Sequence, residues 1–241
     1  MNRYAFVTGA DRGVGLALVK GLLARGYTVF AGQYMPEWTE LAELKREQGD
    51  SLLLVPLDIG SGYSVGEAAK QVTAVTDRLE LLVNAAAILG DTEASIEDEL
   101  NFEEMQQVYN VNTLGALRVT NALIGLVLKG EGKLVVNISS EAGSVEDSER
   151  TGWFAYCMSK SALNMQSKLI FNRIAPQGGK VLVVHPGWVR TYMSGQLSTE
   201  GELSADESAA AILRLSDERL QPGYKQQELS LIDYSGRQMN W

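Results

Sequence analysis

The chain has 241 residues, of which 45% are hydrophobic, and it carries a formal net charge of −9. This length and apolar content suffice for one sizeable core, and the acidic balance argues against nucleic acid as a partner because phosphate backbones would be repelled. Cys157 and His185 are the only cysteine and histidine, which excludes an intrachain disulfide and a metal site built from clustered cysteines and histidines.

Strand-like and helix-like segments alternate from the N-terminus onward. The expected strands are short apolar runs at 4–8, 28–31, 52–57, 79–83, 134–138, 181–184 and 229–232. The expected helices show apolar residues at helical spacing and cover 14–25, 37–48, 65–75, 102–129, 153–174 and a segment that begins at Ser204. Ser204 and Glu207 form a capping-box pattern at the start of that last helix.

Several expected strands are continuous apolar runs, such as Leu-Leu-Leu-Val at 52–55. Such runs suit strands that are buried on both faces, as in a parallel sheet covered by helices. Together with the alternation, they predict an α/β fold of the Rossmann type, a doubly wound parallel sheet of about seven strands with helices on both faces. No linker or internal repeat divides the chain, so residues 1–241 are expected to form a single domain.

The N-terminus runs directly into an apolar strand, without a charged segment followed by a long apolar stretch. We find no window of ~18 apolar residues that would predict a membrane span, and no basic amphipathic segment. The sequence therefore predicts a cytoplasmic protein without a signal peptide or a membrane partner.

A glycine-rich loop at 8–15, Thr-Gly-Ala-Asp-Arg-Gly-Val-Gly, joins the first expected strand to the first helix. Its glycines allow a sharp turn and a close approach to a pyrophosphate, and the helix N-terminus supplies free N–H groups. The spacing is Gly-x-x-x-Gly-x-Gly rather than Gly-x-Gly-x-x-Gly, and a plain strand-to-helix turn would also use glycines. The strand before it and the helix after it favour a dinucleotide phosphate site.

The end of the second expected strand indicates which dinucleotide would bind. NAD sites usually carry an acid there, whereas residues 30–34 read Phe-Ala-Gly-Gln-Tyr and the next acid is Glu37. Arg12, inside the glycine loop, could pair with a 2′-phosphate through two N–H groups, or could be a solvated loop residue. The combination favours NADP(H) over NAD(H).

Tyr156 and Lys160 lie four residues apart on an expected helix and therefore share one helix face. A nearby ammonium favours the phenolate and would lower the pKa of Tyr156 from its usual value of ~10. Tyr156 would then be suited to give and take a proton near neutral pH, although such pairs also occur by chance in helices.

Five motifs together resemble the short-chain dehydrogenase/reductase family, and they stand in the family's order. They are the loop at 8–15, Asn84, Asn112, Ser140 upstream of Tyr156 and Lys160, and Pro-Gly-Trp-Val-Arg-Thr at 186–191. The run His-Pro-Gly-Trp at 185–188 and the tail at 228–241 are similar to carbonyl-reductase-like and C-factor-like members.

The resemblance implies an NADP(H)-dependent oxidoreductase that moves a hydride between the cofactor and a small-molecule carbonyl or alcohol. Tyr156 would be the general acid/base, and Ser140 would polarise the carbonyl oxygen. Lys160 would bind the nicotinamide ribose and lower the pKa of Tyr156, and Asn112 would hold a water in a proton relay. The choice of Ser140 over Ser139 rests on the family pattern.

The resemblance also implies a set of cofactor-binding residues that lie on several loops. They are Gly9, Asp11, Arg12, Gly13, Val14, Gly15, Asp58, Ile59, Asn84, Ala85, Ala86, Tyr156, Lys160, Pro186, Gly187, Val189 and Thr191. Ordinary structural roles remain open for some of them: Asp58 could form a turn, and Asn112 could satisfy backbone groups where its helix bends.

The chain departs from the family pattern at 84–87, where Asn-Ala-Ala-Ala replaces Asn-Asn-Ala-Gly. The last alanine could crowd the backbone or demand a different backbone angle, which would affect cofactor affinity. The segment between Thr191 and Ser204, where relatives carry much of the substrate lid, is short and predicts an open pocket for varied carbonyls.

Two other functions stay open: a C-factor-like signalling protein that binds the dinucleotide with little or no turnover, and a nucleotide-sugar epimerase or dehydratase. The second is disfavoured because such relatives have a different glycine spacing and longer chains. We expect His185 not to be a general base and Cys157 to be a packing residue. Helices 102–129 and 153–174 pair between subunits in many relatives, which would give a homodimer or homotetramer, although monomers also occur.

Overall fold

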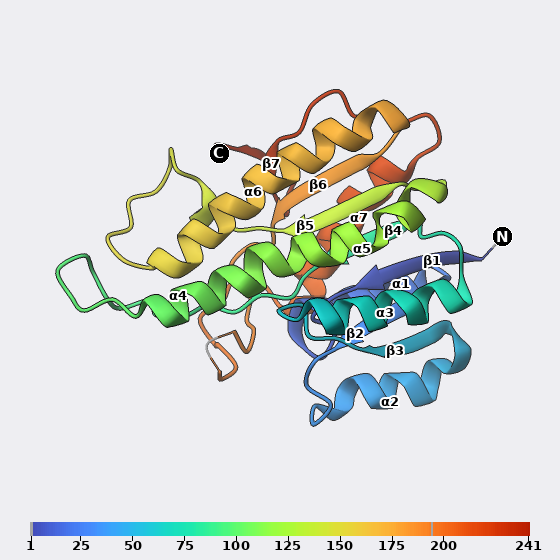
Figure 1. Ribbon diagram of the computed structural model, residues 1–241, viewed down its shortest axis with the longest axis horizontal. Coiled ribbons are helices and arrows are strands. Elements are labelled where there is room, and N and C mark those ends of the chain that lie inside the picture. Colours follow the sequence, from blue (N-terminus) through green and yellow to red (C-terminus); the bar gives the residue numbers. More distant parts are fainter. Residues whose placement is uncertain (1, 194) are drawn as a thin grey trace.

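The computed structural model describes residues 2–193 and 195–241 (Figure 1). Within this part of the chain, eight strands form one sheet: β1 Arg3–Val7, β2 Tyr27–Gln33, β3 Leu52–Pro56, β4 Leu81–Asn84, β5 Leu134–Ile138, β6 Lys180–His185, β7 Leu231–Asp233 and β8 Gln238–Met239. The helices are α1 Gly13–Ala24, α2 Thr39–Gln48, α3 Gly62–Val75, α4 Phe102–Tyr109, α5 Ala116–Lys129, α6 Phe154–Ile174 and α7 Ala205–Leu220. Short turns of other helix types are η1 Gly49–Ser51, η2 Asn110–Gly115, η3 Glu141–Gly143 and η4 Ala175–Gln177.

The strand order is β3-β2-β1-β4-β5-β6-β7-β8, and the pairs are parallel except for β7 with β8. The chain moves outward from β1 to β3 and then crosses back to the other side of β1 with β4. The connections that leave the carboxyl ends of β1 and β4 therefore diverge, and ligands bind at such a point in doubly wound sheets. The predicted fold is confirmed, with an eighth strand in place of about seven.

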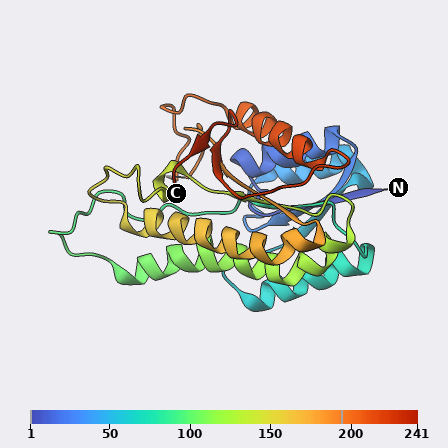
Figure 2. The same cartoon turned by 90° about the horizontal axis from the view of Figure 1, so that it is seen from above.

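Helices cover both faces of the sheet, as Figure 2 shows: α3, α4, α5 and α6 on one face, and α1, α2 and α7 on the other. The core accordingly has two halves, one around Leu22 and Leu213 and one around Leu123 and Phe171. Because β5 lies between them, each of its residues is buried, as the apolar run at 134–138 predicted.

The expected helix at 102–129 is one continuous helical segment that contains the π turn η2 between α4 and α5. By length and composition this segment, with 28 residues, could cross a membrane, which corrects the expectation that no window is apolar enough to predict a span. Half of its apolar window is buried inside the protein, and α5 packs against α3 and α6. The π turn coincides with Asn112, whose side chain bonds outside its own helix.

Capping explains where two helices begin. Ser61 accepts a hydrogen bond from the Ser64 N–H at 3.3 Å, so α3 begins at Gly62, three residues before the expected start. The predicted capping box of α7 is present, with the Glu207 N–H bound to Ser204 Oγ at 3.2 Å and the Ser204 N–H bound to Glu207 Oε2 at 2.8 Å. Both caps lie in connections that flank the carboxyl edge of the sheet.

Candidate functional site

The glycine loop joins β1 to α1 and packs against the segment that follows β4. Gly9 has φ of +63°, and a Cβ at this position would lie 2.7 Å from the Cα of Ala86. A Cβ at Gly15 would lie 1.9 Å from the carbonyl oxygen of Gly9. Only glycine fits at both positions, and the loop presents the N-terminus of α1 at the carboxyl edge of the sheet.

Thr8 precedes this loop and binds the same segment, a role that its place in the sequence did not reveal. Its Oγ1 accepts hydrogen bonds from the N–H groups of Ala85 at 3.0 Å and Ala86 at 3.1 Å. Among the described residues other than glycine, positive φ angles occur only at Lys133 and Trp153. The alanine at 87 therefore needs no strained backbone angle, contrary to what its place in the pattern suggested.

Asp11 and the turn after β2 are joined by hydrogen bonds. Asp11 is buried, and its carboxylate accepts from the Tyr34 N–H at 3.1 Å and the Met35 N–H at 2.9 Å. Asp11 therefore fixes the turn after β2, at the end of the site where the nucleotide would bind. Its Oδ1 already accepts hydrogen bonds from the backbone of that turn.

Arg12 is half-buried between two aromatic side chains. Its guanidinium carbon lies 4.6 Å from the ring centre of Trp38 and 5.4 Å from that of Tyr192. One N–H group donates to the carbonyl oxygen of Tyr192 at 3.3 Å. The two rings meet edge to face with their centres 4.8 Å apart, so Arg12 is held beside the end of β2 rather than solvated.

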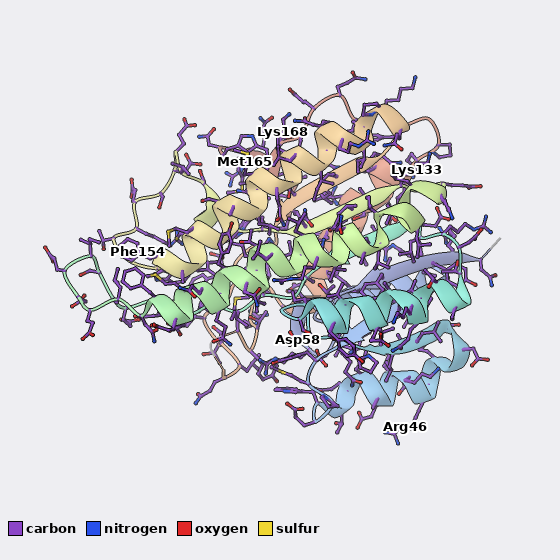
Figure 3. The ribbon with its side chains drawn as sticks, in the orientation of Figure 1. Arg46, Asp58, Lys133, Phe154, Met165 and Lys168 are labelled. Atoms are coloured by element: carbon purple, nitrogen blue, oxygen red, sulfur yellow. The ribbon has the colours of Figure 1, made fainter. Side chains whose placement is uncertain are left out.

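Asp58 and Ile59 follow β3. Figure 3 shows Asp58 beside the start of α3, far from Phe154 at the start of α6. The carboxylate of Asp58 is exposed and accepts from the Gly60 N–H at 2.8 Å, so it has the turn-forming role that was left open for it. Ile59 is buried against Gly115, where a Cβ would lie 2.8 Å from its side chain.

Asn84 ends β4 and belongs to a buried polar network. Its amide donates to Asn137 at 2.8 Å and to Thr120 at 3.0 Å, and Asn137 donates to Ser167 at 2.7 Å. The Oδ1 atom of Asn84 has no hydrogen-bond partner among the described residues. The hydrogen bonds of this network connect β4 with β5, α5 and α6 in the interior next to the site.

Tyr156 and Lys160 are buried on the first turns of α6. The Lys160 ammonium donates to the carbonyl oxygen of Ile138 at 2.8 Å and lies 5.5 Å from the ring centre of Tyr156. Burial lowers the pKa of Lys160 to about 8. Burial and then the charge of Glu141 raise the pKa of Tyr156 above its usual value.

The expected net lowering of the pKa of Tyr156 is therefore wrong for this structure, because this pKa is raised. Loss of water around the phenol and the nearby Glu141 carboxylate both favour the protonated tyrosine, and they outweigh the Ser140 hydrogen bond and the charge of Arg150, which lower the pKa. The same burial makes the charge on Lys160 costly.

The two serines after β5 have different partners. Ser139 is buried, and its Oγ donates to Asn164 at 2.6 Å. Ser140 shares a side-chain hydrogen bond with Tyr156, and its own hydroxyl donates to Glu141 Oε2 at 2.6 Å. The structure thus places Ser140, and not Ser139, beside Tyr156, as the family pattern implied.

Glu141 has no signal in the sequence that would have marked it as part of the site, because its partners come from separate parts of the chain. Its carboxylate lies 2.6 Å from an Arg150 nitrogen and 3.1 Å from His185 Nδ1. Burial would raise the pKa of Glu141, but the Ser140 hydrogen bond, the nearby His185 and the charge of Arg150 outweigh it, so this pKa is lowered. An ionised carboxylate therefore lies next to the Ser140 hydroxyl.

Asn112 is buried in the π turn and joins three segments. Its Oδ1 accepts from the Ile88 N–H at 2.8 Å, and its Nδ2 donates to the Ile88 carbonyl at 2.8 Å and to Ser159 Oγ at 3.0 Å. Its side chain thus satisfies backbone groups, which was the alternative role. These bonds hold the loop after β4 against α6 near Tyr156.

The segment after β6 returns to the glycine loop. Gly187 has φ of +85°, and a Cβ there would lie 2.6 Å from Leu203. The carbonyl of Pro186 accepts from Ser208 Oγ at 2.7 Å, and Val189 pairs with Leu203. Thr191 reaches Gly13, whose Cβ would lie 3.7 Å from its methyl group.

His185 and Cys157 behave as neither a general base nor a nucleophile. Burial lowers the pKa of His185, and its Nδ1 is occupied by Glu141, whose N–H lies 3.2 Å away. Burial raises the pKa of the Cys157 thiol, which disfavours the reactive thiolate.

Comparison with known proteins agrees with this geometry. The model of the short chain dehydrogenase family matches residues 3–202. An uncharacterized oxidoreductase of Schizosaccharomyces pombe is 35% identical over 196 residues, which cover 80% of this chain and 76% of the relative. The C-signal protein of Myxococcus xanthus is 32% identical over 166 residues, which cover 69% of this chain and 95% of that protein.

The crystal structure of NADPH-bound carbonyl reductase from chicken fatty liver superposes with a TM-score of 0.87 at 30% identity and covers 100% of this chain and 99% of the other. The family match extends over most of the chain and includes the glycine loop, Ser140, Tyr156 and Lys160. The chain therefore belongs to the short-chain dehydrogenases, and it is an oxidoreductase of the carbonyl-reductase-like group.

Proposed function

We propose that this enzyme uses NADP(H) to reduce the carbonyl group of a small molecule, or to oxidise the corresponding alcohol. The observation that carries the proposal is the placement of Ser140, Tyr156 and Lys160 together at the carboxyl end of β5. A buried phenol beside a hydroxyl and an ammonium suits the transfer of one proton to or from a substrate oxygen.

The glycine loop fits a dinucleotide. A Cβ at Gly9 or Gly15 would collide with neighbouring backbone, so only glycines allow the tight turn that presents the loop and the N-terminus of α1 to a phosphate. Arg12 fits a 2′-phosphate, since its hydrogen bond to Tyr192 uses one of the five N–H groups of the guanidinium. The carboxylate that would favour NAD is absent from the end of β2. When bound, the nicotinamide supplies or accepts the hydride.

The side chains would divide the remaining chemistry between them. Tyr156 gives its proton to the carbonyl oxygen during reduction, and its raised pKa keeps it protonated at neutral pH. Lys160, with a pKa of about 8, is mostly charged at neutral pH, stabilises the phenolate that remains and binds the ribose. Ser140 polarises the same oxygen after its hydroxyl turns from Glu141 toward the substrate.

The test is calorimetric titration of the purified protein with NADPH and with NADH, compared between wild type and Arg12→Ala. Calorimetry is preferred to fluorescence because Arg12 packs on Trp38. We expect tighter binding of NADPH, and a loss of about tenfold or more for NADPH alone in Arg12→Ala, because a charge-assisted bidentate contact is removed.

Arg46→Ala is the matched control, because Arg46 lies on α2 with its side chain mostly exposed (Figure 3). It should leave both affinities unchanged. Tighter binding of NADH, or an equal loss for both cofactors in Arg12→Ala, would contradict the preference for NADP(H). Failure of the wild type to bind either cofactor would contradict the oxidoreductase function at this site.

The similarity to C-signal keeps a second candidate, a dinucleotide-binding signalling protein with little turnover. Tyr156→Phe separates the two functions. An enzyme loses turnover in this variant, whereas a signalling protein keeps its biological effect.

A further inference from the structure

Glu141 is an ionised side chain that bonds directly to Ser140, and the mechanism above gives it no role. It stands in η3, directly after Ser140, and about two fifths of its side chain is exposed. Arg150, from the loop before α6, pairs with its carboxylate, and the backbone N–H of Glu141 donates to Nδ1 of His185 at the end of β6. Its place is therefore set by contacts from two other segments of the chain.

The hydrogen bonds around Ser140 have a direction. A serine hydroxyl has one proton, and Ser140 gives it to Glu141 Oε2 at 2.6 Å, a short, charge-assisted bond. Ser140 Oγ can then only accept, and it accepts from the Ala142 N–H at 3.1 Å. While its proton is directed at Glu141, Ser140 has none to give to Tyr156, so a phenolate there would lose the Ser140 hydrogen bond that lowers the pKa of Tyr156.

We propose that Glu141 is a positioning residue that accepts the Ser140 proton and keeps Tyr156 protonated. This proposal rests on the proposed function, because a protonated Tyr156 prepares the site for carbonyl reduction rather than for alcohol oxidation. Reduction begins with a protonated Tyr156, and oxidation begins with a tyrosinate. A tyrosinate would face both the lone pairs of Ser140 and the charge of Glu141.

The other charged and titratable groups around this pair do not cancel the effect. Arg150 opposes Glu141, while Cys157 on α6 acts in the same sense as Glu141 on Tyr156. The Lys160 ammonium lies 5.5 Å from the centre of the Tyr156 ring and donates to the carbonyl oxygen of Ile138. His185 faces Glu141 and also Asp233 of β7, and burial favours its neutral form. Burial and the charge of Glu141 raise the pKa of Tyr156.

The test compares Glu141→Gln with Arg150→Gln, which should act in opposite directions. Glutamine keeps the size of Glu141 and an oxygen that can accept from Ser140, but removes the charge. The pH at which Tyr156 ionises is measured in the cofactor-free protein from tyrosinate absorbance, as the difference between each variant and the same variant with Tyr156→Phe. This subtraction is needed because the chain has nine tyrosines.

We expect Glu141→Gln to lower that pH by about one unit and to speed alcohol oxidation at neutral pH by about tenfold, since the tyrosinate fraction changes tenfold per unit. Arg150→Gln should raise the ionisation pH and slow oxidation. Glu146→Gln is the matched control, because Glu146 is exposed five residues from Glu141, and it should change neither quantity.

An unchanged or raised ionisation pH in Glu141→Gln would overturn the proposal, as would shifts of the same sign in Glu141→Gln and Arg150→Gln. A merely structural role for Glu141 predicts loss of stability without opposite shifts. If Glu141→Gln does not fold, the direction of the shift in Arg150→Gln decides. The absorbance titration needs no substrate, so it decides even if no carbonyl is reduced and the proposed function fails.

Discussion

The two ends of the site are built in different ways. At the end of β5, Ser140, Tyr156 and Lys160 are buried; hydrogen bonds orient Ser140 and Lys160, and Tyr156 lies beside Ser140. At the end of β2, Arg12 is half-buried and is held by two aromatic rings and one hydrogen bond of 3.3 Å. The proton-transfer end is preorganised by the core, whereas the nucleotide end depends on side chains from surface connections.

This difference predicts different consequences of substitution at the two ends. Substitution of Ser140 at the end of β5 should reduce turnover with little effect on cofactor affinity. Changes in the glycine loop should reduce stability and affinity together, because the loop contacts both the ligand position and the segment after β4.

Ser140→Ala should have a large effect, a loss of about 10²–10³-fold in turnover, because it removes a hydrogen bond to the developing charge on the substrate oxygen. Ser139→Ala is the matched control, since Ser139 Oγ is engaged by Asn164 and not by Tyr156. It should lower stability while turnover stays within a fewfold. Steady-state kinetics of both variants separate these effects, and equal losses of turnover would show that the two serines have not been distinguished correctly.

Gly9→Ala should destabilise the protein by roughly 3 kcal/mol or more, the sum of left-handed backbone strain and of overpacking against Ala86. Gly178→Ala is a suitable control, because its φ is +76° and nothing lies within 4 Å of the added Cβ. That control should lose only the strain component, roughly 1–2 kcal/mol. Urea unfolding measures both, and equal losses would mean that the contact with Ala86 contributes nothing.

Lys160→Met should change how the free energy of unfolding depends on pH. The pKa of Lys160 is about 8 in the folded protein, while the unfolded chain keeps it near ~10.4, so the unfolded state binds more protons between these values. The stability of wild type should rise with pH across this window, and any advantage of Lys160→Met at neutral pH should shrink.

Lys168→Met is the matched control, because Lys168 is exposed on α6 (Figure 3). Its free energy of unfolding should differ from that of wild type by an amount that is constant across the same pH window. Unfolding experiments at several pH values test both variants. A difference between Lys160→Met and wild type that does not change with pH would contradict the lowered pKa of Lys160.

Strands with a long apolar run were predictable, because burial on both faces leaves a signal in the sequence itself. The run at 134–138 is β5 without any change of bounds. β8 was not predictable, since Gln238 and Met239 form a strand only by pairing with β7 after a turn in which Asp233 accepts the Ser235 N–H at 2.9 Å. The π turn was missed for a related reason, because it depends on tertiary contacts of Asn112.

Within the site, Tyr156, Lys160 and the glycine loop were predictable from spacing and family pattern. The direction of the Tyr156 pKa was not, because it depends on burial and on Glu141, whose partners Arg150 and His185 come from elsewhere in the chain. The packing of Arg12 between Trp38 and Tyr192 was likewise not predictable, since the two aromatic residues lie far apart in the sequence.

The most direct measurement is the oxidation of NADPH by the purified protein in the presence of a panel of small carbonyl compounds, with wild type and Tyr156→Phe compared after both are shown to bind NADPH equally. We predict that wild type consumes NADPH only when a carbonyl is present, and that Tyr156→Phe is slower by about 10²–10⁴-fold because it lacks the general acid. Equal rates in the two proteins would contradict a role for Tyr156 in proton transfer, and with it the mechanism proposed for this site.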